Sequence, residues 1–479
     1  MSHCSIVPPY LLDALAGSPD QELARRAGES LRLDERHRSG RSPRATGRPA
    51  PSARPESTPE TAGPHPNRII GDAAGQTLTP GTIVRREGEP VTDDIVVTEA
   101  YDALGLTWTM WHQVFGRDSL DGRAMPLRAT VHYGQNYDNA FWDGRQMVFG
   151  DGDQIVFQRF TRSIDVIGHE LAHGVTEFTA GLRYAGQSGA LNESISDVFG
   201  SLVKQHAAGQ SAKRADWLIG ADLLTDQVNG RALRDMLNPG TAYDDPRLGK
   251  DPQPAHMTDY VVTDDDNGGV HLNSGIPNRA FALAALAIGG NAWQGAGAIW
   301  WAAVNGDGIR ADCDFATFAE LTVSAAPDER SRTAVREAWQ SVGVATGTDD
   351  TAAAPRRGTG HGIDQGAAGR HPGPDTTITL RRSGGFTGLV TERQLRLDEL
   401  PAADVRSWQS LLAAPARLTV AADTGGAPGA TRRPDAFQYQ LSCPDCDVDL
   451  VLGEPELSDT ARTLFQRALA RPVDGTPPE

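Results

Sequence analysis

The chain has 479 residues, enough for two to four domains and at least one large hydrophobic core. Apolar residues make up 39%, charged residues 22%, and mean hydropathy is −0.39, which excludes collagen and wholesale disorder. The net charge of −17 argues against nonspecific binding to nucleic acid or to anionic membranes. We therefore expect no nucleic-acid partner, no membrane partner and no transmembrane helix.

The N-terminus and the cysteines bear on the compartment. Residues 1–17 lack both a basic start and an uninterrupted apolar run, so they do not resemble a secretory signal peptide. The four cysteines are too few and too scattered for a disulfide framework, and the CxxC pair Cys443 and Cys446 is typical of a turn with two ordinary thiols. We expect a cytoplasmic protein by default, with non-conventional export as the alternative.

Composition divides the chain into six segments. In chain order they are a short prosegment over 1–36, an Arg-, Pro- and Ser-rich linker over 37–66, a β-rich lobe over 67–162, a helical lobe over 163–346, a second linker over 347–375 and a small α+β domain over 376–471. Leucines at helical spacing predict a helical segment within 8–33.

Local patterns predict the main elements of each part. The β-rich lobe is expected to hold strands at 95–97, 127–133 and 147–149, and the helical lobe to hold helices around 163–175, 191–207, 278–289 and 333–342. In the last domain we expect strands at 378–384, 417–422 and 436–441 and helices near 402–412 and 458–470.

The string IDVIGHELAHGVTEF carries the first chemical signal. It places His169 and His173 four residues apart on one helix face, with Glu170 beside the first histidine. Two imidazoles at that spacing can share one Zn²⁺, and the neighbouring carboxylate can reach a metal-bound water. Taken alone, the motif also fits a surface helix with two solvated histidines.

A second string, GALNESISDVFG, completes the ligand set. It places Glu193 and Asp197 four residues apart on another helix. A catalytic zinc site needs three protein ligands and an open position, which His169, His173 and Glu193 supply. Asn192 and Asp197 are then placed to hydrogen-bond the outer imidazole nitrogens. The competing interpretation, a helix with an ordinary acidic face, requires both strings to be coincidences.

These strings belong to a larger set. HELAH, TAGLRY, SGALNESISD, NAFWDG, GDGD and DNGGVHLNSGIPN resemble the thermolysin-like zinc metallopeptidases and occur in matching order across residues 67–346. The resemblance implies an α+β fold in which a β-rich N-terminal lobe and a helical C-terminal lobe flank a cleft with one catalytic Zn²⁺ at its base. It also implies protein or peptide substrates, and we expect a monomer.

The resemblance assigns roles to individual residues. Glu170 would be the general base, His271 and Tyr184 would stabilise the tetrahedral intermediate, and Asp266 would orient His271. The substrate-binding set would comprise Asn139 and Ala140 for the substrate backbone, Arg234 for the carbonyl after the scissile bond, and Phe157, Phe160, Val166 and Leu233 for an apolar pocket that takes the residue after the cut.

Calcium binding is doubtful. Calcium-stabilised members of the family carry an acidic cluster around a double calcium site, and here Lys204, Leu218 and Ala221 stand where three of those carboxylates would be. Asp165 and Asp216 remain. Because calcium needs several oxygen ligands with enough negative charge, we expect a weak or absent double site.

The two flanking parts carry resemblances of their own. Pro8-Pro9-Tyr10 resembles the prosegment of the protealysin-like branch, which implies a zymogen whose N-terminus occupies or covers the cleft; the alternative is a floppy Pro-bearing tail. Residues 376–471 resemble emfourin, a small proteinaceous inhibitor of such enzymes. The alternative there is a domain that binds a substrate or partner and no longer inhibits.

The sequence thus predicts a zinc-dependent neutral endopeptidase that cuts on the N-terminal side of bulky apolar residues and is made as a precursor with a prosegment and a fused inhibitor-like domain. An alternative is a catalytically restrained protease–inhibitor fusion that acts as a regulator. Another is a self-protected effector. The intact Glu170 favours the enzyme over a silent scaffold.

Overall fold

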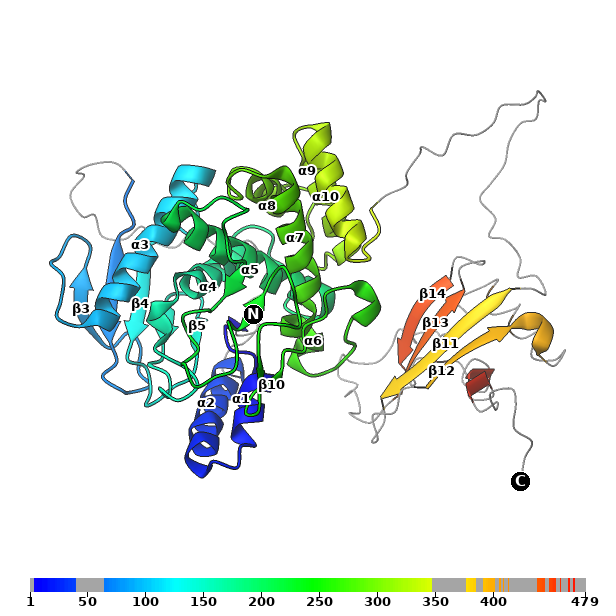
Figure 1. Cartoon of the computed structure of the whole chain (residues 1–479), viewed down its shortest axis with the longest axis horizontal. Helices are drawn as coiled ribbons and strands as arrows, with labels where there is room; N and C mark the ends of the chain where they lie inside the picture. The colour runs from blue at the N-terminus through cyan, green and yellow to red at the C-terminus, as the bar shows by residue number, and fades with distance from the viewer. Residues whose placement is uncertain are drawn as a thin grey trace, which may run out of the picture. The chain divides into compact units, whose positions relative to one another are not determined.

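The computed structural model describes residues 4–39, 64–346, 376–384, 391–400, 437–443 and 448–453, with a few single residues between 405 and 469. The chain divides into two compact units, Met1–Ala352 and Ala353–Glu479 (Figure 1). Each unit has its own buried hydrophobic core, so each is described by itself.

A six-stranded sheet runs through the first unit. Its strands are β1 (Cys4–Ser5), β2 (Arg68–Asp72), β3 (Thr82–Arg86), β4 (Leu127–Val131), β5 (Ala140–Trp142) and β6 (Met147–Phe149). Their order is β1-β5-β6-β4-β2-β3, with β2, β4 and β6 parallel and the other pairs antiparallel. The expected strands at 127–133 and 147–149 are confirmed, and the N-terminal segment supplies the edge strand β1.

Helices make up most of the rest of this unit. They are α1 (Pro9–Ala16), α2 (Gln21–Ser39), α3 (Ile95–Phe115), α4 (Ile164–Glu177), α5 (Gly186–Ala208), α6 (Asp266–Asn273), α7 (Gly275–Ile288), α8 (Ala296–Asn305), α9 (Phe315–Ala325) and α10 (Glu329–Ser341). Two short antiparallel pairs accompany them, β7 (Leu218–Ile219) with β8 (Arg234–Asp235) and β9 (Asp244–Asp245) with β10 (Gly249–Lys250). The four expected helices of the 163–346 segment are confirmed.

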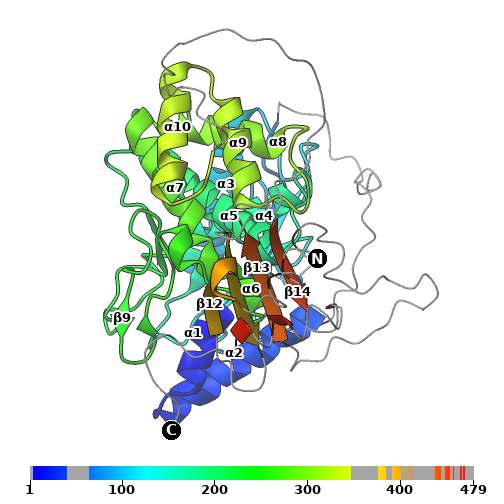
Figure 2. The ribbon, with the colours of Figure 1, turned by 90° about the vertical axis from the view of Figure 1, so that its right-hand side faces the viewer.

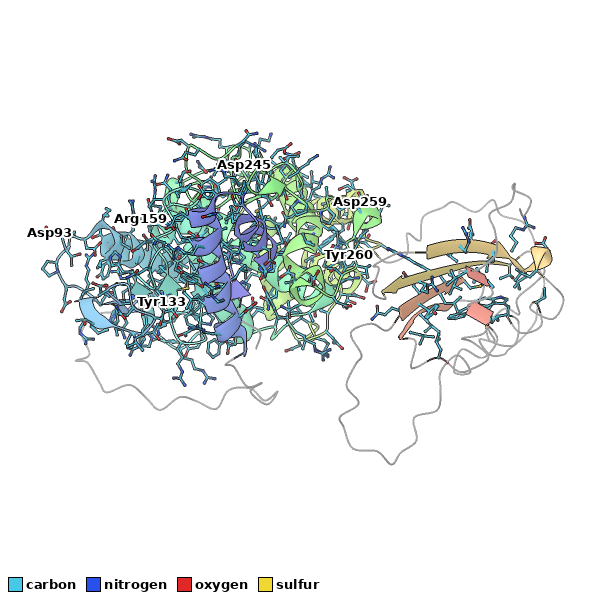
Figure 3. All side chains as sticks on the ribbon, turned by 90° about the horizontal axis from the view of Figure 1, so that it is seen from below. Asp93, Tyr133, Arg159, Asp245, Asp259 and Tyr260 are labelled. Carbon is cyan, nitrogen blue, oxygen red and sulfur yellow. The ribbon has the colours of Figure 1, made fainter. Side chains whose placement is uncertain are left out.

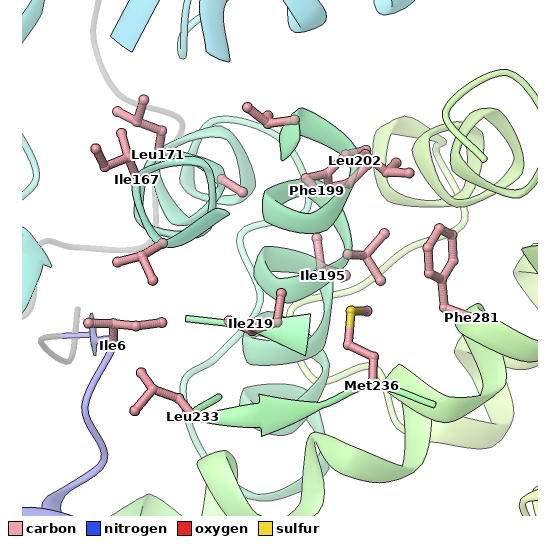
Figure 4. Close-up of a cluster of buried hydrophobic side chains, with 14 of the residues drawn as sticks. Ile6, Ile167, Leu171, Ile195, Phe199, Leu202, Ile219, Leu233, Met236 and Phe281 are labelled. Atoms are coloured by element: carbon pink, nitrogen blue, oxygen red, sulfur yellow. The ribbon is translucent and has the colours of Figure 1, made fainter. Parts of the chain in front are cut away.

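Helices α4 and α5 lie in the middle of the unit, with α7 to α10 on one side of them (Figure 2). Two glycines let α4 and α5 approach closely, since a Cβ on Gly200 would lie 2.3 Å from the Asp165 carbonyl oxygen and one on Gly168 would lie 3.0 Å from Gly200 Cα. Apolar side chains from both helices, among them Ile167, Leu171, Ile195, Phe199 and Leu202, fill the surrounding core (Figure 4).

One prediction for the β-rich lobe is wrong. Residues Ile95-Val96-Val97 were expected to form a strand, yet they open the 21-residue helix α3. Asp94 caps this helix by accepting hydrogen bonds from the backbone N–H groups of Val96 and Val97, and left-handed Gly116 ends it. The β-branched triplet favours a strand locally, but an N-cap and a long buried helix face override that preference.

The N-terminal segment is an integral part of the first unit. Helix α1 starts at Pro9, a position where proline suits a helix, and buries Leu11, Leu12 and Leu15 in the main core. Helix α2 runs to Ser39, past the expected boundary at residue 36. Its Leu33 packs against a small cluster that contains Tyr133, and Figure 3 shows this helix crossing the face of the unit.

The second unit contains a four-stranded antiparallel sheet. Its strands are β11 (Thr377–Gly384), β12 (Thr391–Arg396), β13 (Phe437–Cys443) and β14 (Val448–Gly453), in the order β12-β11-β13-β14. Trp408 and Phe465 stack in its core with ring centroids 5.5 Å apart. The described residues within 402–412 and 458–470 are helical, whereas 417–422 and Cys446 lie outside the described residues. Cys443 is buried at the end of β13.

Across the described parts of the chain, every helix is too short or too polar to cross a lipid bilayer.

A histidine between two carboxylates joins the sheet to α3. His132 Nδ1 lies 2.8 Å from Asp151 Oδ2, and its Nε2 lies 2.9 Å from Asp94 Oδ2. Hydrogen bonding to Asp151 outweighs partial burial and, with help from Asp94, raises the pKa of His132 to about 9. Because Asp94 is also the N-cap of α3, this ion-paired cluster links the start of that helix to the end of β4.

We predict that the stabilisation by His132 is lost at high pH. The pKa of His132 is raised in the folded state, so its contribution is complete below the ordinary value near 6.5 and disappears as the pH rises through 9. His132→Asn, which tolerates the φ of 52° at this position, should cost on the order of 1 kcal/mol at pH 6 and nothing at pH 10. Urea unfolding at both pH values measures this difference, and an equal cost at both would contradict the ionic interpretation.

Candidate active site

Three buried side chains from α4 and α5 converge on one point. His169 and His173 lie one turn apart on α4, with their Nε2 atoms 3.1 Å from each other. Glu193 on α5 faces them, with Oε2 3.5 Å from His169 Nε2 and Oε1 3.4 Å from His173 Nε2. These are the three predicted metal ligands, and within the described ranges no other trio of His, Cys, Asp or Glu comes together in this way.

The surroundings of the trio fit a Zn²⁺ ion. His169 Nδ1 lies 2.8 Å from Asp197 Oδ1, and His173 Nδ1 lies 2.8 Å from Asn192 Oδ1, so both Nε2 atoms are left to face the shared point. Burial lowers the pKa of His173 to about 4, which keeps that imidazole neutral. Glu193 Oε2 is buried without a hydrogen-bond partner, and a cation at the centre would satisfy it.

Asp197 connects the trio to the rest of the site. Its carboxylate accepts two hydrogen bonds from Arg234, at 2.8 and 2.7 Å, and one from Asn278 Nδ2 at 2.8 Å. Burial alone would raise the pKa of Asp197, but Arg234 and His169 lower it to about 2. Sequence reasoning missed Asn278 and also Ser196, whose Oγ lies 3.0 Å from His173 Nδ1. The string SGIPN contained Asn278, but its partner lies 81 residues away.

Glu170, the predicted base, points into the same region from α4. Its Oε2 accepts the backbone N–H of Trp142 at 3.0 Å, while Oε1 is buried without a hydrogen-bond partner. Burial, opposed by the neighbouring charge of His169, raises the pKa of Glu170 to about 8. A carboxylate with one unengaged oxygen and a pKa near neutrality is suited to take and return a proton.

Tyr184 and His271, the predicted oxyanion donors, both lie next to Glu193. The Tyr184 hydroxyl donates to Glu193 Oε1 and lies 3.3 Å from His271 Nε2. Asp266 accepts from the His271 backbone N–H at 2.9 Å and lies 2.7 Å from its Nδ1, as expected of an orienting residue. The run from Asp266 to Gly269 has positive φ throughout, which Asn and Gly tolerate and which turns the chain so that His271 faces the trio.

The N-terminal segment lies along the predicted substrate-binding residues. Ile6 donates its N–H to the Ala140 carbonyl at 3.2 Å and accepts from Arg234 Nη1 at 3.1 Å. Val7 donates to Asn139 Oδ1 at 3.0 Å and accepts from Asn139 Nδ2 at 3.2 Å. The structure therefore brings Asn139, Ala140 and Arg234 together around the chain's own backbone.

The Ile6 side chain lies next to one residue of the predicted apolar pocket. Ile6 is fully buried, and Figure 4 shows it beside Leu233. Phe157, Phe160 and Val166, the other residues predicted to line the pocket, are also buried in the hydrophobic core of the first unit. One residue earlier, the Ser5 carbonyl oxygen lies 3.2 Å from His271 Nε2.

Lys204 stands at a position where calcium-stabilised members of the family would carry a carboxylate, and it contacts both remaining aspartates. Lys204 Nζ lies 3.1 Å from Asp165 Oδ2, 3.0 Å from Asp216 Oδ2 and 3.1 Å from the Leu218 carbonyl oxygen. Asp165 is almost completely buried, with 2% of its side chain exposed. The ammonium group thus supplies positive charge among these oxygens.

A buried centre of two histidines and one glutamate, with a second glutamate beside the first histidine, defines a metallopeptidase. Two family models, described as the catalytic domain and the alpha-helical domain of thermolysin metallopeptidase, match residues 70–177 and 180–344. A third, described as emfourin, matches residues 380–469. The chain belongs to the thermolysin metallopeptidase family and carries an emfourin domain.

Individual relatives agree with this assignment. The chain is 49% identical over 344 residues to the extracellular metalloprotease of Pectobacterium carotovorum subsp. carotovorum. This alignment covers 71% of this chain and 96% of the relative. The chain is 43% identical over 302 residues to the extracellular minor metalloprotease of Serratia marcescens, spanning 60% and 78%. The solved precursor of protealysin from Serratia proteamaculans aligns with a TM-score of 0.65 and 50% identity over 71% of this chain and all of that one.

The expected cytoplasmic location is wrong. Both of these enzymes from Pectobacterium and Serratia marcescens are named as extracellular. The expectation rested on the lack of an apolar leader at the N-terminus, and that pattern reports on one export route alone. Residues 4–16 instead form β1 and α1 of the folded unit.

We predict one zinc ion per chain, held by the trio. His173→Ala should remove a ligand and abolish stoichiometric zinc, whereas Asn192→Ala should keep zinc but weaken its binding about 10- to 100-fold. Metal analysis after dialysis and a chelator titration measure the two effects. His256→Ala, a histidine outside the trio, is the control, and zinc loss there equal to that of His173→Ala would refute the assignment.

Proposed function

We propose that this metalloprotease is a zinc-dependent neutral endopeptidase that hydrolyses peptide bonds on the N-terminal side of bulky apolar residues. The observation that carries the proposal is the position of Glu170, buried beside the metal trio and hydrogen-bonded to β5, the strand that pairs with the extended N-terminal segment. The complete burial of Ile6 beside Leu233 supports the preference for a bulky apolar residue after the cut.

The chemistry divides among these residues. Bound zinc would acidify a water molecule and polarise the scissile carbonyl. Glu170 takes the water proton and passes it to the leaving amine. His271 and Tyr184 donate to the developing oxyanion, each contributing on the order of 3 kcal/mol. Asn139, Ala140 and Arg234 hold the substrate backbone in an extended conformation with the contacts that they make to Ile6 and Val7.

We further propose that the chain is a precursor in which the N-terminal prosegment, expected over residues 1–36, blocks the site. Ile6 and Val7 occupy the backbone contacts that a substrate needs, and α1 and α2 anchor them. Helix α2 adds a direct contact, since Asp34 Oδ2 accepts from Asn139 Nδ2 at 2.8 Å. The likeness to the precursor of protealysin supports this proposal.

The emfourin domain is proposed to act as a second restraint. Fusion to the protease gives a domain an effective concentration of about millimolar when the linker spans the distance, so that even a weak contact restrains the enzyme. The separate core of the second unit supports a domain that folds by itself.

Glu170→Gln tests the role of the base. Because Gln keeps the shape but cannot accept the water proton, we expect kcat on a peptide containing an Ala–Leu bond to fall on the order of 10²- to 10⁴-fold with zinc retained. Fluorescence of an internally quenched peptide measures the rate. Glu320→Gln on the exposed face of α9 is the control, and full activity of Glu170→Gln would exclude the mechanism.

The inhibitory role is tested by adding the second unit to the first in trans. A chain that ends at Ala352, once its prosegment is processed, should lose peptidase activity in proportion to added residues 353–479. Trp408→Ala, which removes the stack on Phe465 from the domain core, should weaken this inhibition. If the intact domain leaves the rate unchanged at high concentration, it binds something other than the protease.

Calcium should not stabilise this protein. Lys204 already neutralises the buried Asp165, so we expect the melting temperature to be unchanged by millimolar calcium and calorimetry to detect no tight calcium ion. Lys204→Met leaves a buried carboxylate without its countercharge and should cost about 3 kcal/mol in urea unfolding. Lys213→Met, at an exposed position, should cost almost nothing. Two tightly bound calcium ions in the wild type would contradict the proposal.

A further inference from the structure

The N-terminal segment does more than cover the site, because its register identifies one particular peptide bond. We propose that the Ser5–Ile6 bond is held as a scissile bond and that the enzyme cuts it within its own chain, before or alongside cleavage elsewhere in the prosegment. This inference rests on the proposed endopeptidase function and names a substrate for the same site.

The backbone contacts fix the register. Ile6 and Val7 make the contacts expected of the first and second residues after a cut, through the Ala140 carbonyl, Arg234 and the Asn139 side chain. Ile6 must therefore follow the bond at the reaction centre. A shift by one residue would turn the Ile6 side chain to the other face of the strand and remove it from the core.

The residue before the bond is equally well placed. The Ser5 carbonyl oxygen lies 3.2 Å from His271 Nε2, and the same nitrogen lies 3.5 Å from Glu193 Oε2, a predicted metal ligand. The carbonyl that water must attack is thus at the predicted oxyanion donor, next to the metal trio. Ser5 is also 97% buried, since only 3% of its surface is exposed, so bulk water does not compete for these contacts.

The general base is held by the strand that pairs with this segment. Trp142 is the register partner of Cys4 and donates its backbone N–H to Glu170 Oε2. This hydrogen bond fixes the carboxylate at Trp142, one residue along β5 from Phe141, the register partner of Ser5, and leaves Glu170 Oε1 unpartnered. The antiparallel pairing of β1 with β5 gives the chain an extended backbone through Ser5.

The side chains also match the proposed specificity. The residue after the bond is Ile6, a bulky apolar side chain that is fully buried in the cluster containing Leu233 and Val166. Pro8 and Pro9 follow two residues later, so they do not remove the N–H groups that Ile6 and Val7 donate. A segment that only blocked the site would not need side chains that match the proposed specificity.

The proposed step is an ordinary hydrolysis. The oxygen of one water molecule bonds to the Ser5 carbonyl carbon while the bond from that carbon to Ile6 nitrogen breaks. Glu170 carries the water proton to the Ile6 nitrogen, so the products are a carboxylate at Ser5 and a new amine at Ile6. Residues 1–5 are then no longer covalently attached to the rest of the chain. They are held by non-covalent contacts, which include the pairing of β1 with Phe141 and Trp142.

The cut would remove some of the contacts by which the prosegment blocks the site and keep others. Ile6 and Val7 keep their contacts with Asn139, Ala140 and Arg234, while the contact between Ser5 and His271 is no longer part of the tethered prosegment. The remaining segment holds the site only on the side after the cut. The competing outcome is that the segment stays intact as a stalled substrate, and the experiment separates the two.

The test follows the N-terminus of the full-length, zinc-loaded chain over time by intact-mass spectrometry and N-terminal sequencing. We expect a product that begins at Ile6, formed at a rate independent of protein concentration, and no such product from Glu170→Gln. Ile6→Gly should slow this cut at least 10-fold, whereas Ile6→Leu should preserve it. Thermal unfolding of both variants verifies that they fold.

A second readout does not depend on turnover. In zinc-loaded Glu170→Gln, the amides of Ile6 and Val7 should exchange hydrogen slowly, because both are buried and hydrogen-bonded. Fast exchange would overturn the register. If the wild type hydrolyses an added peptide but keeps its bond between residues 5 and 6, the inference is wrong and the proposed function stands. If the cut appears with a rate that rises with concentration, it is not intramolecular. If neither substrate is cut and a chain that ends at Ala352, once its prosegment is processed, also leaves the added peptide intact, the proposed function fails as well.

Discussion

The site depends on the contacts of one buried carboxylate, that of Asp197. It binds His169 from α4, Arg234 from β8 and Asn278 from α7, so one side chain fixes three elements far apart in the sequence. A buried charge is tolerated only when it is fully paired, and here the guanidinium and the imidazole provide that pairing. The same contacts orient a metal ligand and hold the arginine that binds the backbone of the N-terminal segment. Metal binding and peptide binding are therefore parts of one electrostatic network.

The edge of the sheet serves two purposes. Strand β5 lies between β6 and β1, and its outer side can pair with an extended segment. In this protein the segment is supplied by residues 4–7 of the same chain. The prosegment therefore resembles the substrate in its backbone contacts. Its helices add what a substrate lacks, a hydrophobic anchor and the contact between Asp34 and Asn139.

The two proposed restraints are of different kinds. The N-terminal segment shares the hydrophobic core of the protease, so its removal requires that a folded interface be broken. The emfourin domain belongs to a separate unit of the same chain, so the restraint proposed for it would depend on its effective concentration. Lys204 contributes to stability and not to inhibition. Its ammonium group stabilises the buried carboxylate of Asp165 and, unlike a bound metal ion, cannot dissociate from the chain.

The sequence by itself determined the chemistry. His169 and His173 stand four residues apart, as do Glu193 and Asp197, and local periodicity is enough to bring each pair onto one face of its helix. Local reasoning failed at Ile95 to Val97, where β-branched residues favour a strand but the cap at Asp94 and the burial of a long face decide for a helix. Contacts made by Asn278, Asp34 and Ser5 also required the tertiary structure, because each partner lies more than 80 residues away. Spacing along the chain encodes contacts within a helix, whereas the register of an edge strand and the pairing of a buried charge are decided when distant elements pack together.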